Sequence, residues 1–147
     1  MTTTPAVPAE TIYNLLVADW ARANLPLPNI VQRETAEELR EEIPDEGLVL
    51  VYAESGGVRS SPRGNMMYKD ETVNVIIDVW TLKSHEHLYQ LQGEILRTIE
   101  ENTMDVSPYQ LVRPLSFAEE YGKTFQAWHG DVRVELSRYA IRTGYTI

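Results

Sequence analysis

Two of the three histidines, His85 and His87, flank a carboxylate in the stretch Ser84–Leu88, and these residue types could together bind a metal ion. Ser84 can cap a helix by accepting a hydrogen bond from an exposed backbone amide, and apolar residues follow it at helical spacing. Two residues apart on a helix, the imidazoles point about 200° away from each other and cannot share an ion. The stretch therefore predicts the start of a helix, and we expect no metal site here.

Other catalytic patterns are missing from the sequence. It contains no cysteine, no Gly-x-Ser-x-Gly, no Ser-x-x-Lys and no glycine-rich turn followed by Lys-Ser or Lys-Thr. Adjacent carboxylates such as Glu37-Glu38 and Glu100-Glu101 are typical of solvated helix or loop faces. Asp78 lies within an apolar strand pattern, where we expect a paired or edge-facing aspartate. We therefore expect no catalytic residue and no cofactor.

A third group of residues suggests binding instead of catalysis. It combines two arginines, two methionines and a tyrosine, residue types that are enriched where proteins meet: Arg59, Arg63, Met66, Met67 and Tyr68. The surrounding segment 55–71 is rich in glycine and serine and has almost no periodicity, so we expect a long loop. We predict that the five residues contact another subunit or partner. The alternative is a disordered hairpin tip without a partner.

Composition narrows the class of protein. The 147 residues suit one domain, and 43% apolar with 24% charged residues is close to the average of globular proteins. The formal net charge of −9 disfavours tight binding of nucleic acid. The first ten residues lack a secretory pattern, and the longest apolar run, Leu48 to Ala53, is far short of the ~20 residues that cross a bilayer. We expect a soluble protein without a membrane segment.

Several elements must position these residues. Residues 1–8 are expected to form a mobile arm, and an amphipathic pattern predicts a helix from about Glu10 to Asn24. A capping box at Thr35 predicts a short helix that ends before Pro44. A third helix of about 17 residues is predicted from Ser84 to near Asn102.

Strands are predicted between and after the helices. Branched, aromatic or alternating residues mark them at 48–53, 72–82, 109–112, 123–129 and 132–142. Gly130-Asp131 is predicted to form a tight turn between the last two. The expected fold is a single α+β domain over 1–147, with a mostly antiparallel sheet of four to five strands flanked by two main helices and one short helix.

The order of these elements resembles that of a known family. A helix near the amino terminus and a long loop precede the strand Thr72–Thr81, which leads directly into the helix through Gln92–Arg97 and then a closing strand pair. From about Glu10 to Arg142 the chain resembles the tail terminator proteins of long-tailed phages and related viruses, and the neighbouring tail-completion and head-tail joining proteins. It departs from the smaller members at Leu115 to Lys123, so 114–130 is expected to be an extra hairpin or loop.

The resemblance implies a structural virion protein without catalysis. Such a protein forms a ring, commonly a hexamer, that terminates the tail tube and joins the tail to the head connector. Its partners would be other copies of itself, the tail tube protein and the head-tail connector or stopper protein, with DNA only passing through the bore. It would be found in the tail or neck of the virion after assembly in the host cytoplasm. A neck stopper or adaptor is the alternative within the virion, and a small intracellular enzyme subunit or ligand-binding domain is the alternative of another class.

Overall fold

The computed structural model describes residues 8–32, 43–63, 66–106, 109–122 and 127–142, with side chains for 8–32, 43–54, 72–103, 112–114 and 127–138. Two helices are described, α1 (Pro8–Asp19) and α3 (His85–Glu101). The strands are β1 (Asn29–Val31), β2 (Leu48–Arg63), β3 (Met66–Thr81), β4 (Met104–Val106), β5 (Tyr109–Gly122) and β6 (Ala127–Arg142). Neither described helix is long and apolar enough to cross a membrane.

The strands form one six-stranded sheet in the order β1-β2-β3-β6-β5-β4. Only the edge pair β1–β2 is parallel among the described pairs, and the other four pairs are antiparallel. The predicted α+β class with a mostly antiparallel sheet is therefore confirmed. The sheet has more strands than expected because β1 and β4 are three residues each, too short for a visible alternation.

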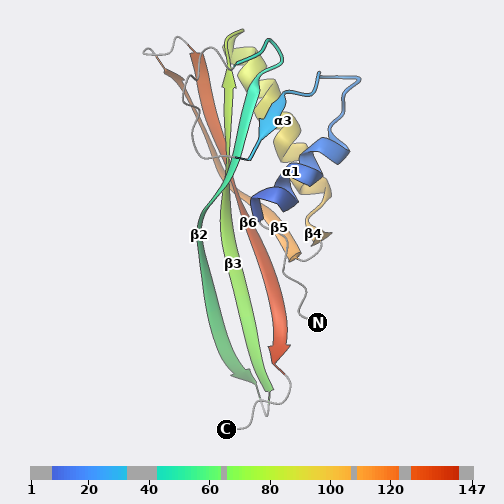
Figure 1. Cartoon of the computed structure of the whole chain (residues 1–147), viewed down its shortest axis with the longest axis vertical. Helices are drawn as coiled ribbons and strands as arrows, with labels where there is room; N and C mark the ends of the chain where they lie inside the picture. Colours follow the sequence, from blue (N-terminus) through green and yellow to red (C-terminus); the bar gives the residue numbers. More distant parts are fainter. Residues whose placement is uncertain (1–7, 33–42, 64–65, 107–108, 123–126, 143–147) are drawn as a thin grey trace.

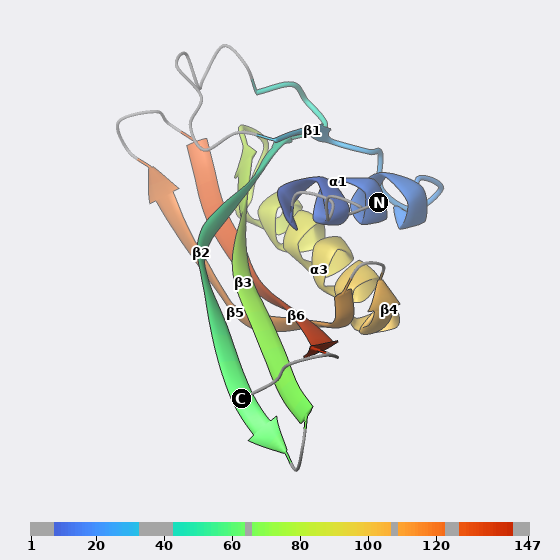
Figure 2. The ribbon, with the colours of Figure 1, turned by 60° about the horizontal axis from the view of Figure 1, so that its bottom comes forward.

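Both helices pack on the same face of the sheet, as the two views in Figures 1 and 2 show. Alternate residues of the central strands point toward the helices, because side chains on a strand alternate between its two faces. These residues are buried together with the apolar stripes of the helices in one core: Ile12, Leu16, Val49, Val51, Val75, Ile77, Val79, Leu88, Leu91, Ile95, Ile99, Val132, Val134 and Leu136. The core thus fixes α1 and α3 to the half of the sheet that contains these residues.

The helix ends follow local chemistry. Ser84 has an extended backbone, with φ −168°, and its side chain accepts a hydrogen bond from the His87 amide at 3.1 Å, so the predicted cap is confirmed. The first helix starts at Pro8 and ends at Asp19, five residues before the predicted end. There the Trp20 indole donates to the Leu25 carbonyl at 2.9 Å, which closes the chain into a turn before the proline-rich run.

The predicted long loop at 55–71 is wrong. Its first part continues β2 to Arg63, and its last part begins β3 at Met66. The pairing runs residue by residue from Gly56, opposite Val73, to Arg63, opposite Met66, after a bulge between Ala53 and Ser55. A glycine- and serine-rich segment has weak strand propensity of its own, and the ladder to a neighbouring strand overrides it.

The predicted turn at Gly130-Asp131 is also wrong. Both residues lie inside β6, opposite Val79 and Asp78 of β3. The segment 114–130 spans the second half of β5 and the start of β6, which pair antiparallel from Gly122 and Ala127 onward. The predicted arm at 1–8, apart from Pro8, and the predicted short helix at 35–43, apart from Ile43, fall outside the described residues.

Candidate functional site

Strands β2, β3 and β6 continue as a narrow sheet past the ends of both helices (Figure 1). We call this part the tongue and define it as 55–63, 66–72 and 137–142. Strand β5 reaches only its base, because the pairing of β5 with β6 begins at Leu111 and Ser137. The tongue is therefore built from three strands, with β3 in the centre.

All five residues predicted to contact a partner lie on the tongue. Arg59 and Arg63 belong to β2, whereas Met66, Met67 and Tyr68 belong to β3. Register places Arg63 directly opposite Met66, with Met67 and Tyr68 at the next two positions. The fold therefore gathers the five residues at the end of a projecting element, where the sequence pattern alone predicted an irregular loop. Their contact role stays a prediction.

A second cluster, which sequence reasoning largely missed, occupies the sheet face opposite the helices. Trp80 and His129 are paired across β3 and β6, and their rings stack with centroids 3.9 Å apart and planes 12° from parallel. Asp78 accepts a hydrogen bond from the Tyr52 hydroxyl at 3.2 Å, and its other carboxylate oxygen lies 3.5 Å from Nε2 of His129. We call these four residues the open-face cluster, because neither described helix covers this face of the sheet.

The open-face cluster contains residue types that can transfer protons, but its geometry is that of cross-strand pairing. Each carboxylate oxygen of Asp78 lies against a group from an adjoining strand of the same sheet. The prediction of a paired aspartate is confirmed. The contributions of Trp80 and His129 could not be found from the sequence, because their contact depends on the register between β3 and β6, and the two residues lie 49 positions apart in the chain.

His85 and His87, which are two residues apart in the sequence, lie in different surroundings. His87 is buried, and its Nδ1 is hydrogen-bonded to the Thr81 hydroxyl at the end of β3. Burial lowers the pKa of His87, and the positive charge of Lys83 lowers it further. His85 is exposed and packs against the Trp128 ring with centroids 5.0 Å apart. Across the part of the chain with described side chains, no three His, Asp or Glu residues are grouped closely enough to hold a metal ion.

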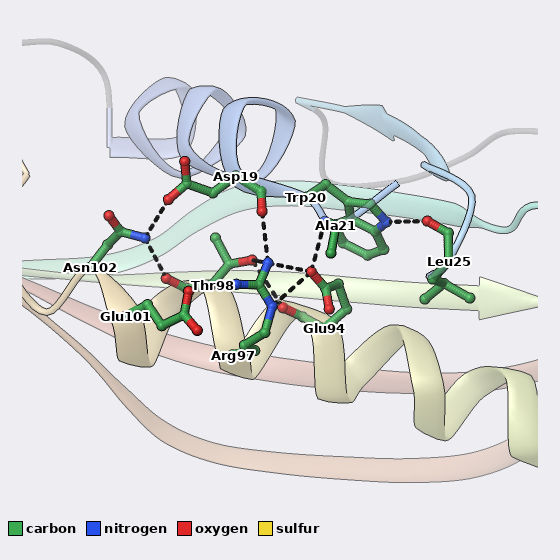
Figure 3. A network of polar contacts seen from close by, with 9 residues as sticks. All are labelled: Asp19, Trp20, Ala21, Leu25, Glu94, Arg97, Thr98, Glu101 and Asn102. Carbon is green, nitrogen blue, oxygen red and sulfur yellow. Dashed lines mark hydrogen bonds and ion pairs between the residues drawn. The ribbon is translucent and has the colours of Figure 1, made fainter. Parts of the chain in front are cut away.

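A polar network joins the carboxyl end of α1 to α3 (Figure 3). Glu94 accepts hydrogen bonds from the Ala21 amide at 3.0 Å and from Nε of Arg97 at 2.9 Å. Arg97 also donates to the Asp19 carbonyl at 2.7 Å, and the Asn102 amide donates to the Asp19 carboxylate at 2.7 Å. The carbonyl of Asp19, at the carboxyl end of α1, is thereby satisfied by a side chain of α3.

The Glu94 carboxylate is the centre of this network. Burial by itself would raise the pKa of Glu94, but the hydrogen bonds from Arg97 and from the Ala21 amide outweigh it and lower the pKa. Only 12% of the Glu94 side chain is exposed, so the carboxylate needs these donors to remain charged. We interpret the network as structural, because it holds α1 in place and its groups are directed at one another.

The chain shares its fold with a protein chain from a solved virion structure. No known protein family and no curated protein matches the sequence. Among solved structures, the chain is similar to a protein chain of the "Virion of native gene transfer agent (GTA) particle". The similarity has a TM-score of 0.63 and 12% sequence identity, and it covers 91% of this chain and 96% of the other. Since it includes nearly all of both chains, the whole fold is shared and not a single supersecondary motif.

Proposed function

We propose that this protein is a structural component of a phage-like virion that forms a ring, terminates the tail tube and joins it to the head connector, without catalysis. The observation that carries the proposal is the fold shared with a chain of a gene transfer agent virion over 91% of this chain. The order of the elements, which by itself resembles tail terminator proteins, supports the same class independently of that comparison.

The tongue supports assembly as the activity of this chain. A projecting sheet that carries Arg59, Arg63 and three contact-type side chains on β3 is suited to reach a neighbouring molecule. A head-to-tail contact of this kind closes into a ring when its rotation divides a full turn. The expected partners are therefore other copies of the chain, the tail tube protein and the connector or stopper, and DNA would pass only through the bore.

The same fold could serve a neck stopper or adaptor, and the test separates these roles. We expect electron micrographs of particles that lack this protein to show overlong tails or tails without heads, because an uncapped tube continues to grow or cannot attach to the head connector. Tails of normal length that lack only the joint would favour the stopper or adaptor. Normal particles would refute the proposal.

Light scattering of the purified chain tests the alternative of a small intracellular enzyme or ligand-binding domain. We expect a ring, commonly a hexamer, or a monomer that forms rings only when tail tube protein is added. A stable small dimer that does not bind tail tube protein would favour the alternative instead. The open-face cluster, with Asp78 and His129, is where such an activity would be sought first.

A further inference from the structure

The tongue has a charge opposite to that of the chain as a whole. The formal net charge is −9, yet the tongue carries basic residues in excess over its acidic residues, Asp70 and Glu71. Its basic residues come from all three strands: Arg59, Arg63, Lys69, Arg138 and Arg142. A local reversal of charge on a projecting element points to recognition of an acidic surface.

Strand register concentrates this positive charge. Asp70 lies opposite Arg59, and Glu71 lies opposite Arg138, so both acidic positions have a basic residue across the ladder. Opposite charges at directly opposed positions attract one another within the sheet. Three basic positions are instead paired in register with uncharged residues on β2, β3 or β6: Arg63, Lys69 and Arg142. The outer part of the tongue is thus its most positive part.

The opposite end of the sheet is acidic. Asp45 and Glu46 are exposed just before β2 begins, and Glu86 is exposed in the first turn of α3, just after β3 ends. Glu119 and Glu120 occupy positions of β5 opposite Gly130 and His129, near the same end. We call these five residues the acidic end. Lys83 is the basic residue that the described part of this end contains.

The two ends are too far apart to neutralise each other within one chain. Strands of 16 residues connect them, which corresponds to about 50 Å. Charges in water are screened beyond about 8 Å at physiological ionic strength. A second copy of the chain can bring an acidic end directly to the tongue. The geometry therefore allows a contact between copies that a single copy cannot make.

We propose that the tongue of one copy docks against the acidic end of the next copy, with Arg63, Lys69 and Arg142 as its recognition residues. The contact is head-to-tail, so it can close into a ring, and it rests on the proposed ring-forming function. DNA is the other polyanion that a basic element could bind. We favour a second copy, because its acidic end supplies exposed carboxylates, Asp45, Glu46 and Glu86, that complement the basic tongue.

The test is a reversal of charge at the tongue. The double variant carries Arg63→Glu and Arg142→Glu. Neither altered position lies opposite an acidic residue in a neighbouring strand, so the substitutions create no like-charge pair within the sheet. We expect self-association, measured by analytical ultracentrifugation, to weaken about 100-fold. Association of the unaltered chain should also weaken as salt rises. Circular dichroism checks that the variant is folded.

A second reversal identifies the partner surface. Adding Asp45→Arg with Glu46→Arg to the tongue variant should restore association to within about tenfold of the unaltered chain, because the charges are again complementary. The matched control adds Glu10→Arg with Glu100→Arg, two exposed positions on the helices, and should restore nothing. If the tongue reversal unfolds the chain, the neutral pair Arg63→Gln with Arg142→Gln should still weaken association about tenfold.

The outcomes separate this inference from the proposed function. If rings form equally well after the charge of the tongue is reversed, the docking contact is overturned but the proposed ring is not. A chain that stays monomeric at low salt and with tail tube protein would overturn both. Binding of a short DNA duplex that the tongue reversal abolishes, with self-association unchanged, would assign the tongue to DNA and overturn the docking contact.

Discussion

The two halves of the long strands differ in what surrounds them. In one half, α1 and α3 cover a sheet face whose residues Val75, Ile77 and Val79 are completely buried. In the other half the same strands continue as the tongue, beyond both helices (Figure 2). One continuous ladder thus provides a stable core at one end and a projecting contact element at the other. We expect mutations in the first half to alter stability, and mutations in the second half to alter assembly.

The largest effect on stability is expected in the covered half. Ile77→Ala removes a fully buried side chain from the centre of the core, which should cost about 3 kcal/mol of the free energy of unfolding, measured by urea denaturation. Ile141→Ala, at a tongue position of β6 opposite Tyr68, is the matched control and should cost less than about 1 kcal/mol. Equal losses at the two sites would remove the distinction between the halves.

A glycine pair tests how closely the covered half is packed. Gly47 has φ +100°, and a Cβ there would come within 2.8 Å of Leu91 Cδ1 and 3.3 Å of the Trp80 carbonyl oxygen. Gly47→Ala should therefore destabilise the fold by about 1–3 kcal/mol in thermal or urea unfolding. Gly93 lies exposed on α3 with nothing near its Cβ position, so Gly93→Ala should stabilise by about 0.5–1 kcal/mol. A loss of stability in both Gly47→Ala and Gly93→Ala would contradict this account.

The network between the helices should give a smaller effect. Glu94→Gln removes the charge that the Ala21 amide and Arg97 bind, and should cost about 1–2 kcal/mol at neutral pH. The pKa of Glu94 is lowered in the folded state, so its stabilisation is present above the unfolded value of 4.5 and is lost as pH falls through the folded pKa. Urea denaturation at several pH values measures this. The exposed Glu100→Gln should change stability little, and an equal effect there would argue against the network.

His87 should make the stability of the fold depend on pH nearer to neutrality than Glu94 does. Its pKa is lowered in the folded state, so the unfolded chain binds a proton more readily below the ordinary value of 6.5. Stability contributed by neutral His87 is therefore present above pH 6.5 and declines below it. In His87→Gln we expect melting temperatures to fall less steeply between pH 7 and pH 5 than in the unaltered chain. The exposed His85→Gln is the control, and a profile identical to that of His87→Gln would rule out this assignment.

The smallest effect on stability is expected at the tongue. Arg59→Ala with Arg63→Ala should change the free energy of unfolding by less than about 0.5 kcal/mol and leave the melting temperature nearly unchanged, yet impair ring or virion assembly. Calorimetry and electron microscopy of assembled particles provide the two measurements. Normal assembly by the double variant would exclude these two arginines from the contact surface.

The sequence by itself determined the elements that have a strong local signal. Branched residues in alternation marked the centre of β3, and Ser84 with its following apolar spacing marked α3 almost to the residue. It also identified Arg59, Arg63, Met66, Met67 and Tyr68 as a group suited to contact, because residue type alone carries that information. These features follow from interactions between residues close in the chain, which a single sequence displays directly.

Only the tertiary structure decided that 55–63 and 66–71 belong to two paired strands, that Gly130-Asp131 continues a strand, and that the ring of Trp80 stacks on that of His129. In each case the deciding interaction joins backbone or rings from distant parts of the chain, and the ladder overrides weak local propensity. The separation of charge between the tongue and the acidic end arises in the same way. Every charge was visible in the sequence, but strand pairing brought basic residues from three strands to one end.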